Sequence, residues 1–191
     1  VYTAPPRQSF IAALKDFKEV WEIHYSDNPP KVFNGTVHDF HMAEGLSEKG
    51  SFPVQYIKLD DYLDDFFFDQ QYDNIIGAAR NAKNGQVFNL NIKQKIADLD
   101  LSGMPHLGSG ITWKYKDTTV LATPNLKENT VTIIDTKNWE TIKKIRTQGP
   151  GFFMRSHENS PYAWVDVFVG ANRDLMHVID KSTLEIVKTL K

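Results

Sequence analysis

Residues 130–135 read Thr-Val-Thr-Ile-Ile-Asp, the polar residues 136–138 follow, and a second β-like segment occupies 142–145. Alternating apolar and polar residues are typical of a half-buried β-strand. Two such segments on either side of a short polar turn predict a β-hairpin. We therefore expect an antiparallel hairpin at this point of the chain.

The hairpin pattern repeats along the chain, with further copies that combine an apolar strand, a polar turn and a second strand. These copies lie at residues 86–101, 175–190 and, in a weaker form, 19–25. The residues expected to end the first strands are Asn91, Asp135 and Asp180, so the spacings are 135 − 91 = 44 and 180 − 135 = 45. A period of this length is typical of the blades of a β-propeller.

Further β-like segments fill the space between the hairpins, at residues 110–113, 119–123, 152–155 and 162–168. Each period then holds about four short strands separated by turn residues, which is the composition of a propeller blade. Residues 9–17 also fit a helical spacing, but we interpret 10–14 as a buried strand because it precedes a repeat hairpin. The sequence therefore predicts an all-β fold of about four blades.

One insertion interrupts the period. The weak first copy ends near Tyr25, and 91 − 25 = 66 leaves about 22 residues more than one repeat. Residues 28–52 contain prolines and glycines without a sustained period, so we expect a long loop there. Within this loop, His38, His41 and Glu44 have the spacing of metal ligands on a helix. Glycines on both sides make a stable helix short at best, so we do not favour a metal site.

Composition excludes several functions. Apolar residues make up 41% and charged residues 24%, as in ordinary globular proteins. The formal charge of −2 gives no electrostatic signature for nucleic acid or anionic lipid, and no apolar run approaches the ~20 residues that span a bilayer. The absence of cysteine excludes disulfides, thiolate nucleophiles and covalent haem attachment.

Two turns make the chain resemble a known family. Residues 104–110 read Met-Pro-His-Leu-Gly-Ser-Gly, and residues 149–160 read Gly-Pro-Gly-Phe-Phe-Met-Arg-Ser-His-Glu-Asn-Ser. With the 130–135 strand and Trp-Val-Asp at 164–166, they resemble, in order and spacing, the haem d1 propeller of the cytochrome cd1 nitrite reductase family. The resemblance covers residues 2–191 except the 28–52 insertion. It implies that the chain is about four blades of an eight-bladed cytochrome d1 type propeller.

The resemblance also implies a function. Members hold haem d1 non-covalently in the central cavity and reduce nitrite to nitric oxide, a step of denitrification in the periplasm. His106 occupies the turn that carries one of two distal histidines in these oxidoreductases. Asp64 lies where the second is expected, and Ser109 replaces an arginine that can meet a haem carboxylate. These departures point towards relatives that bind haem d1 or its precursors during biosynthesis.

The chemistry of the residues in the two turns supports part of this expected function. An imidazole at His106, in a turn between strands, can transfer a proton to a bound anion near neutral pH, or simply bond to backbone. Arg155 and His157 bring a cation and hydrogen-bond donors to one strand end, as an anionic ligand needs. The alternative is a tight turn in which Asn159 and Ser160 bond their own backbone. We therefore predict a catalytic role for His106, with Ser109, Arg155 and His157 as further cofactor-binding residues.

Residues 59–73 carry six aspartates and three consecutive phenylalanines. We interpret them as a solvated acidic loop before a buried strand, because no EF-hand spacing accompanies the carboxylates. His24 and His177 lie within repeat strands and are expected to pack on a sheet face. The four tryptophans are spread over the repeat regions and also predict sheet packing.

Assembly follows from the blade count. Four blades leave the outer faces of the first and last sheets without a neighbour. We expect either the remaining blades of a parent chain, or a homodimer that closes a ring of eight, to cover residues such as 10–14 and 175–190. A compact monomer, and a non-catalytic propeller fragment that binds other proteins, are the alternatives.

Overall fold

A computed structural model describes residues 1–34, 50–79 and 83–191 of the chain. The residue 130–145 hairpin is present as β11 (Thr130–Asp135) and β12 (Thr141–Arg146), which pair antiparallel. The described residues form four sheets of four strands, each in simple sequence order. The all-β prediction of about four blades is therefore confirmed.

The strand bounds follow one plan in every blade. The first blade comprises β1 (Tyr2–Ala4), β2 (Ser9–Leu14), β3 (Glu19–His24) and β4 (Val54–Lys58). The second comprises β5 (Asp65–Phe68), β6 (Asn74–Ala78), β7 (Gly85–Asn89) and β8 (Gln94–Leu99). The third adds β9 (Ile111–Tyr115) and β10 (Thr118–Pro124) to β11 and β12. The fourth comprises β13 (Met154–Ser156), β14 (Tyr162–Asp166), β15 (Met176–Asp180) and β16 (Glu185–Leu190).

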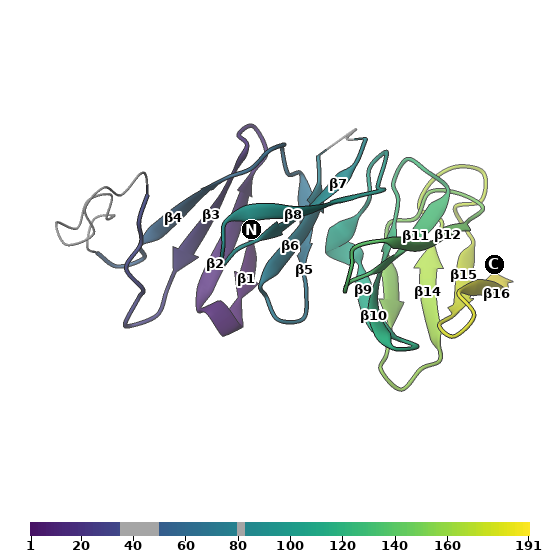
Figure 1. The fold of residues 1–191 in the computed structure, drawn as a ribbon. Coiled ribbons are helices and arrows are strands. Elements are labelled where there is room, and N and C mark those ends of the chain that lie inside the picture. The colour runs from purple at the N-terminus through teal and green to yellow at the C-terminus, as the bar shows by residue number, and fades with distance from the viewer. Residues whose placement is uncertain (35–49, 80–82) are drawn as a thin grey trace.

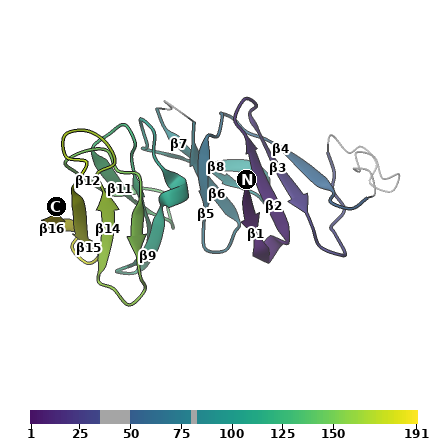
Figure 2. The same ribbon diagram turned by 180° about the vertical axis from the view of Figure 1, so that it is seen from behind.

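Three apolar cores hold the four sheets in a row, which Figures 1 and 2 show from opposite sides. Ile11 and Val20 of the first blade pack with Phe66 and Ile75 of the second. A second core lies between the second and third blades, and a third between the third and fourth. Each sheet thus buries one face against the next, as propeller blades do.

The expected repeat needs one correction. We expected the first strand of the hairpin in the second blade to end at Asn91, but this strand, β7, ends at Asn89. The Asn89 side-chain oxygen accepts hydrogen bonds from the backbone amides of Asn91 and Ile92, both at 3.0 Å, so the turn begins two residues early. Measured between strand ends, the spacings are 135 − 89 = 46 and 180 − 135 = 45.

The 28–52 insertion lies between β3 and β4 of the first blade. Its residues 35–49, and with them His38, His41 and Glu44, are outside the described residues. The strand interpretation of residues 10–14 is confirmed by β2. The helices of the described part are two three-residue 3-10 turns, η1 (Pro5–Arg7) and η2 (Leu107–Ser109), and neither is long enough to cross a membrane.

Candidate functional site

His106 lies in the connection from β8 to β9, directly before η2. Its backbone amide donates to the Pro124 carbonyl at 2.9 Å, which ties the turn to its own blade. Its ring Nδ1 lies 2.5 Å from the Phe152 carbonyl oxygen, at the start of the fourth blade. A carbonyl only accepts, so Nδ1 carries the proton. In the neutral form of the ring, the lone pair is then at Nε2, which can accept a proton.

The turn that carries His106 is built into three blades. Leu107 is fully buried in the core between the second and third blades. Ser109 is 2% exposed, and its Oγ accepts a hydrogen bond from the Met154 amide at 2.9 Å. The Gly108 amide donates to a carboxylate oxygen of Asp65 at 2.8 Å. These contacts hold the imidazole at the end of the blades where β1, β5, β9 and β13 begin.

Aromatic side chains surround His106 at this end. The ring centroid of Phe152 lies 4.1 Å from that of His106, and Phe153 and Phe168 lie 4.5 and 4.7 Å from Phe152. Phe153 is 50% exposed and Phe168 is 53% exposed. We call His106, Phe152, Phe153 and Phe168 the aromatic wall. A half-exposed apolar surface of this kind is typical of a binding site.

Arg155 extends the aromatic wall with a positive charge. Its guanidinium lies over the Phe153 ring, 5.8 Å from the centroid, and Nη1 donates to the Met154 carbonyl at 2.7 Å. The remaining guanidinium donors can meet a carboxylate. Arg155 therefore stays a candidate for binding an anionic group, whereas the Ser109 hydroxyl is buried against Met154. The cofactor-binding role of Ser109 stays a prediction.

His157 does not join His106. His157 directly follows β13 at one end of that strand. His106 contacts Phe152 and Phe153, which directly precede β13 at its other end. The Asn159 amide donates to His157 Nδ1 at 3.2 Å, and the Ser160 amide donates to the His157 carbonyl at 3.0 Å. The Ser160 hydroxyl also accepts from the Tyr162 amide at 3.2 Å, so the Ser160 part of the alternative offered by the sequence is present in this turn. The cofactor-binding role of His157 also stays a prediction.

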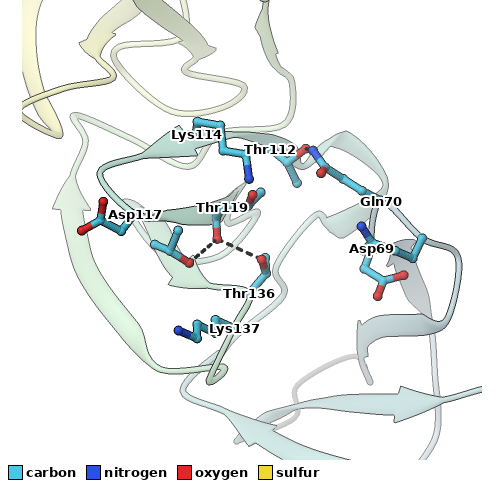
Figure 3. A pocket seen from close by; sticks show the side chains of 10 residues that line it. Asp69, Gln70, Thr112, Lys114, Asp117, Thr119, Thr136 and Lys137 are labelled. Carbon is cyan, nitrogen blue, oxygen red and sulfur yellow. Dashed lines mark hydrogen bonds between the residues drawn. The ribbon is translucent and has the colours of Figure 1, made fainter.

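His157 instead lines a cavity of about 650 Å³ together with Lys114 and Lys181. The Lys181 amine donates to the carbonyls of His157 and Ser160, at 2.9 and 2.7 Å. An adjoining pocket of about 280 Å³ opens between the second and third blades (Figure 3). It is polar: the Thr119 carbonyl accepts from the Thr136 hydroxyl at 2.9 Å, as Figure 3 shows. The smaller pocket has no lining residue in the turn that carries His106, whereas Gly110, the last residue of that turn, lines the larger cavity.

The acidic run of the second blade is only partly solvated. Asp60 is exposed and pairs with Lys95 at 3.2 Å, as expected of a surface loop. Asp65 differs, because it begins β5 and its carboxylate faces Gly108. Of the three consecutive phenylalanines, Phe66 is fully buried, and the next two are half-buried.

Sequence reasoning missed Tyr2 and Asp65, which lie beside the His106 turn. The Tyr2 hydroxyl lies 3.5 Å from Asp65 Oδ1, and burial together with the Asp65 charge raises the pKa of Tyr2. Tyr2 stands at the start of the chain and Asp65 within a run of six aspartates, so neither had a distinctive pattern. In the described part of the chain, no three His, Cys, Asp or Glu side chains are placed to hold a metal ion.

The aromatic wall fits a flat, largely apolar ring that carries carboxylate groups. Phe153 and Phe168 offer exposed ring surface, and the Arg155 guanidinium lies next to Phe153. The Nε2 lone pair of His106 supplies a base within the same cluster. These residues therefore fit a tetrapyrrole better than a small polar substrate.

A family model, a curated protein and a solved structure all relate the chain to haem d1 proteins. The family model described as "Cytochrome D1 heme domain" matches residues 1–191. The chain is 44% identical over 191 residues to the dihydro-heme d1 dehydrogenase of Pseudomonas aeruginosa, and covers 34% of that protein. It also matches the solved structure of dihydro-heme d1 dehydrogenase NirN in complex with DHE, with a TM-score of 0.83, 44% identity, and coverage of 100% of this chain and 36% of that one.

A more distant structure shares the fold alone. Kuenenia stuttgartiensis hydrazine synthase matches 98% of this chain and 47% of its own, with a TM-score of 0.65 and 12% identity. The chain spans about a third of the length of the dehydrogenase relatives.

Proposed function

Because the chain belongs to the cytochrome d1 haem domain family, we propose that it forms part of a propeller that binds a tetrapyrrole of the haem d1 class against the aromatic wall. One observation carries the proposal. His106 Nδ1 lies 2.5 Å from the Phe152 carbonyl oxygen, which leaves Nε2 free of this contact, inside a cluster of half-exposed aromatic rings. The rings provide apolar contact for a planar ligand, and Arg155 provides a partner for a carboxylate.

The reaction that we propose is removal of hydrogen from dihydro-haem d1, in the sense of the relative's name. A dehydrogenation takes two electrons and two protons from the substrate, so it needs a base. His106 Nε2 accepts one proton, the Phe152 carbonyl stabilises the resulting imidazolium through Nδ1–H, and the second proton passes to solvent water. When bound, the iron tetrapyrrole would supply the electron-transfer chemistry, and an external one-electron oxidant, reduced twice, would take the two electrons.

Nitrite reduction is the alternative that the family resemblance offers. The position that corresponds to the second distal histidine of the reductases holds Asp64 in this chain. A carboxylate at that position disfavours an anionic substrate such as nitrite, because like charges repel. The resemblance therefore supports a role in haem d1 biosynthesis more than reduction of nitrite.

Tetrapyrrole binding can be tested by visible absorption. Titrating the protein, together with any blades that adjoin this chain, with dihydro-haem d1 should shift the Soret band. His106→Ala should slow conversion to haem d1 by about 100-fold, the scale of a lost general base. His157→Ala is measured in the same assay, because a slower conversion would support the predicted cofactor-binding role of the imidazole at the far end of β13, whereas unchanged conversion would reject that role. No band shift in the unaltered protein would reject the proposal.

The same preparation separates the two reactions. Anaerobic incubation with dihydro-haem d1 and an electron acceptor should yield haem d1, whereas nitrite and a reductant should yield no nitric oxide. Release of nitric oxide without formation of haem d1 would favour the reductase alternative. We further propose a periplasmic location by family resemblance, and a precursor that lacks an export signal would contradict it.

A further inference from the structure

We infer that Asp65 is the positioning residue that holds the His106 turn in place. Its carboxylate contacts Tyr2 of the first blade and the Gly108 amide in the connection between the second and third blades. The catalytic consequence rests on the proposed function, whereas the positioning itself rests only on the contacts described here.

The central contact is a charge-assisted hydrogen bond. The Gly108 amide, two residues after His106, donates to Asp65 Oδ2 at 2.8 Å. Hydrogen bonds to an ionised carboxylate are roughly twice as strong as neutral ones. The bond spans 43 positions of sequence and joins the first residue of β5 to the short η2 turn. The η2 turn has no side-chain cap of its own, so Asp65 supplies the order that a cap would give.

Gly108 shows how closely this contact is fitted. A Cβ at this position would lie 2.5 Å from the Tyr2 hydroxyl oxygen and 2.9 Å from Asp65 Oδ1. The backbone of the turn therefore lies directly against the Tyr2–Asp65 pair. Any larger residue would displace that pair or move the turn.

The other side of the turn is held by the fourth blade. Ser109 Oγ accepts from the Met154 amide, and His106 Nδ1 donates to the Phe152 carbonyl. Two contacts therefore hold the turn that carries the imidazole: Asp65 of the second blade and the Phe152 carbonyl at the start of the fourth. Losing Asp65 releases one of them, so the ring can leave the orientation that points Nδ1 at Phe152. An active-site base that is misplaced by about 1 Å can lose about 100-fold in rate.

Two substitutions separate positioning from charge. Asp65→Asn keeps a side-chain oxygen that can accept from the Gly108 amide, whereas Asp65→Ala removes the acceptor. Asp117→Ala is the matched control, because Asp117 is an exposed aspartate in the β9–β10 turn, at the other end of the blades. Urea unfolding of all three variants identifies any general loss of folding.

Amide hydrogen exchange of the peptide containing Gly108, without tetrapyrrole, tests the contact itself. The measurement uses the protein with its adjoining blades. We expect Asp65→Ala to exchange at least about tenfold faster than the unaltered protein, Asp65→Asn to lie between the two because its neutral oxygen accepts a weaker bond, and Asp117→Ala to be unchanged. Equal exchange in Asp65→Ala and the unaltered protein would overturn the inference.

Nitrogen-15 histidine spectra report the tautomer of His106 independently of activity. Nδ1–H should dominate in the unaltered protein and in Asp65→Asn, and a mixture of tautomers should appear in Asp65→Ala. If the exchange and the tautomer change but the unaltered protein converts no dihydro-haem d1, the proposed function fails and the positioning role stands. If conversion proceeds equally in Asp65→Ala, the positioning role fails and the proposed function stands.

Discussion

At the scale of single residues, the buried imidazole of His177 connects the fourth blade to the loop that precedes it. His177 is fully buried, its Nε2 accepts from the Gln148 amide at 3.1 Å, and its Nδ1 lies 2.9 Å from the Thr189 hydroxyl. Both ring nitrogens are engaged only in the neutral form. Burial lowers the pKa of His177 accordingly.

This lowered pKa predicts acid sensitivity. The unfolded chain binds a proton near the ordinary histidine pKa of about 6.5, and the folded chain binds it only at lower pH. The stabilising contribution is therefore present above about pH 6.5 and is lost as the pH falls through the folded-state value. The urea midpoint should fall between about pH 7.5 and about pH 5.5, and more steeply in the unaltered protein than in His177→Gln.

Some pH dependence should remain in His177→Gln, because burial also lowers the pKa of His24. An identical slope in His177→Gln would show that its protonation does not affect folding.

Residue-level prediction from sequence worked where a motif isolates a side chain. His106 stands alone in a Pro-His-x-Gly turn, so its position in a blade connection could be anticipated. Asp65 could not, because five other aspartates within residues 59–73 have the same chemistry. Its role depends on the Gly108 amide, 43 positions away, and no local pattern encodes that contact.

At the scale of elements, Gly77 on β6 shows how a strand depends on the loop beside it. A Cβ on Gly77 would overlap Leu63 Cδ1 and lie 2.9 Å from the Asp65 carbonyl. Leu63 is 1% exposed and belongs to the core between the first two blades. The absence of a side chain at Gly77 therefore makes room for Leu63 and lets the chain enter β5.

A double-mutant cycle tests this packing. Gly77→Ala should destabilise the fold by about 1–3 kcal/mol through overpacking. Leu63→Ala should cost about 2–5 kcal/mol through the cavity it leaves. The double variant should be more stable than the sum of the two losses predicts, by at least about 0.5 kcal/mol in urea unfolding.

Gly50→Ala is the control, because no atom lies within 4 Å of a Cβ at that position, and it should be neutral. Strict additivity of the Gly77 and Leu63 losses would show that the two positions do not compete for space.

The elements were more predictable than the contacts between them. Alternating segments and polar turns gave the hairpins of the last three blades, because each hairpin is local in sequence. The end of β7 was misplaced by two residues because the Asn89 side chain starts the turn before the alternation ends. Which faces meet is a long-range property, and the three inter-blade cores were visible only in the structure.

At the scale of the whole molecule, the outer faces of the first and last blades have no blade beside them in the described residues. Trp164 is 37% exposed and Met176 is 41% exposed on the last sheet, and Phe10 is 39% exposed on the first. Further blades of a longer chain, or a second copy that closes a ring of eight, stay predictions for what covers them. The mass of the isolated 21.8 kDa chain in solution distinguishes a second copy from a monomer.

The central claim is that the aromatic wall binds a tetrapyrrole of the haem d1 class. The most direct measurement is a crystal structure of the protein, with its adjoining blades, in complex with dihydro-haem d1. The account predicts that the macrocycle lies against Phe153 and Phe168, with His106 Nε2 facing the ligand and a ligand carboxylate near Arg155. A macrocycle bound at the His157 cavity, or one that leaves Phe153 and Phe168 exposed to solvent, would contradict it.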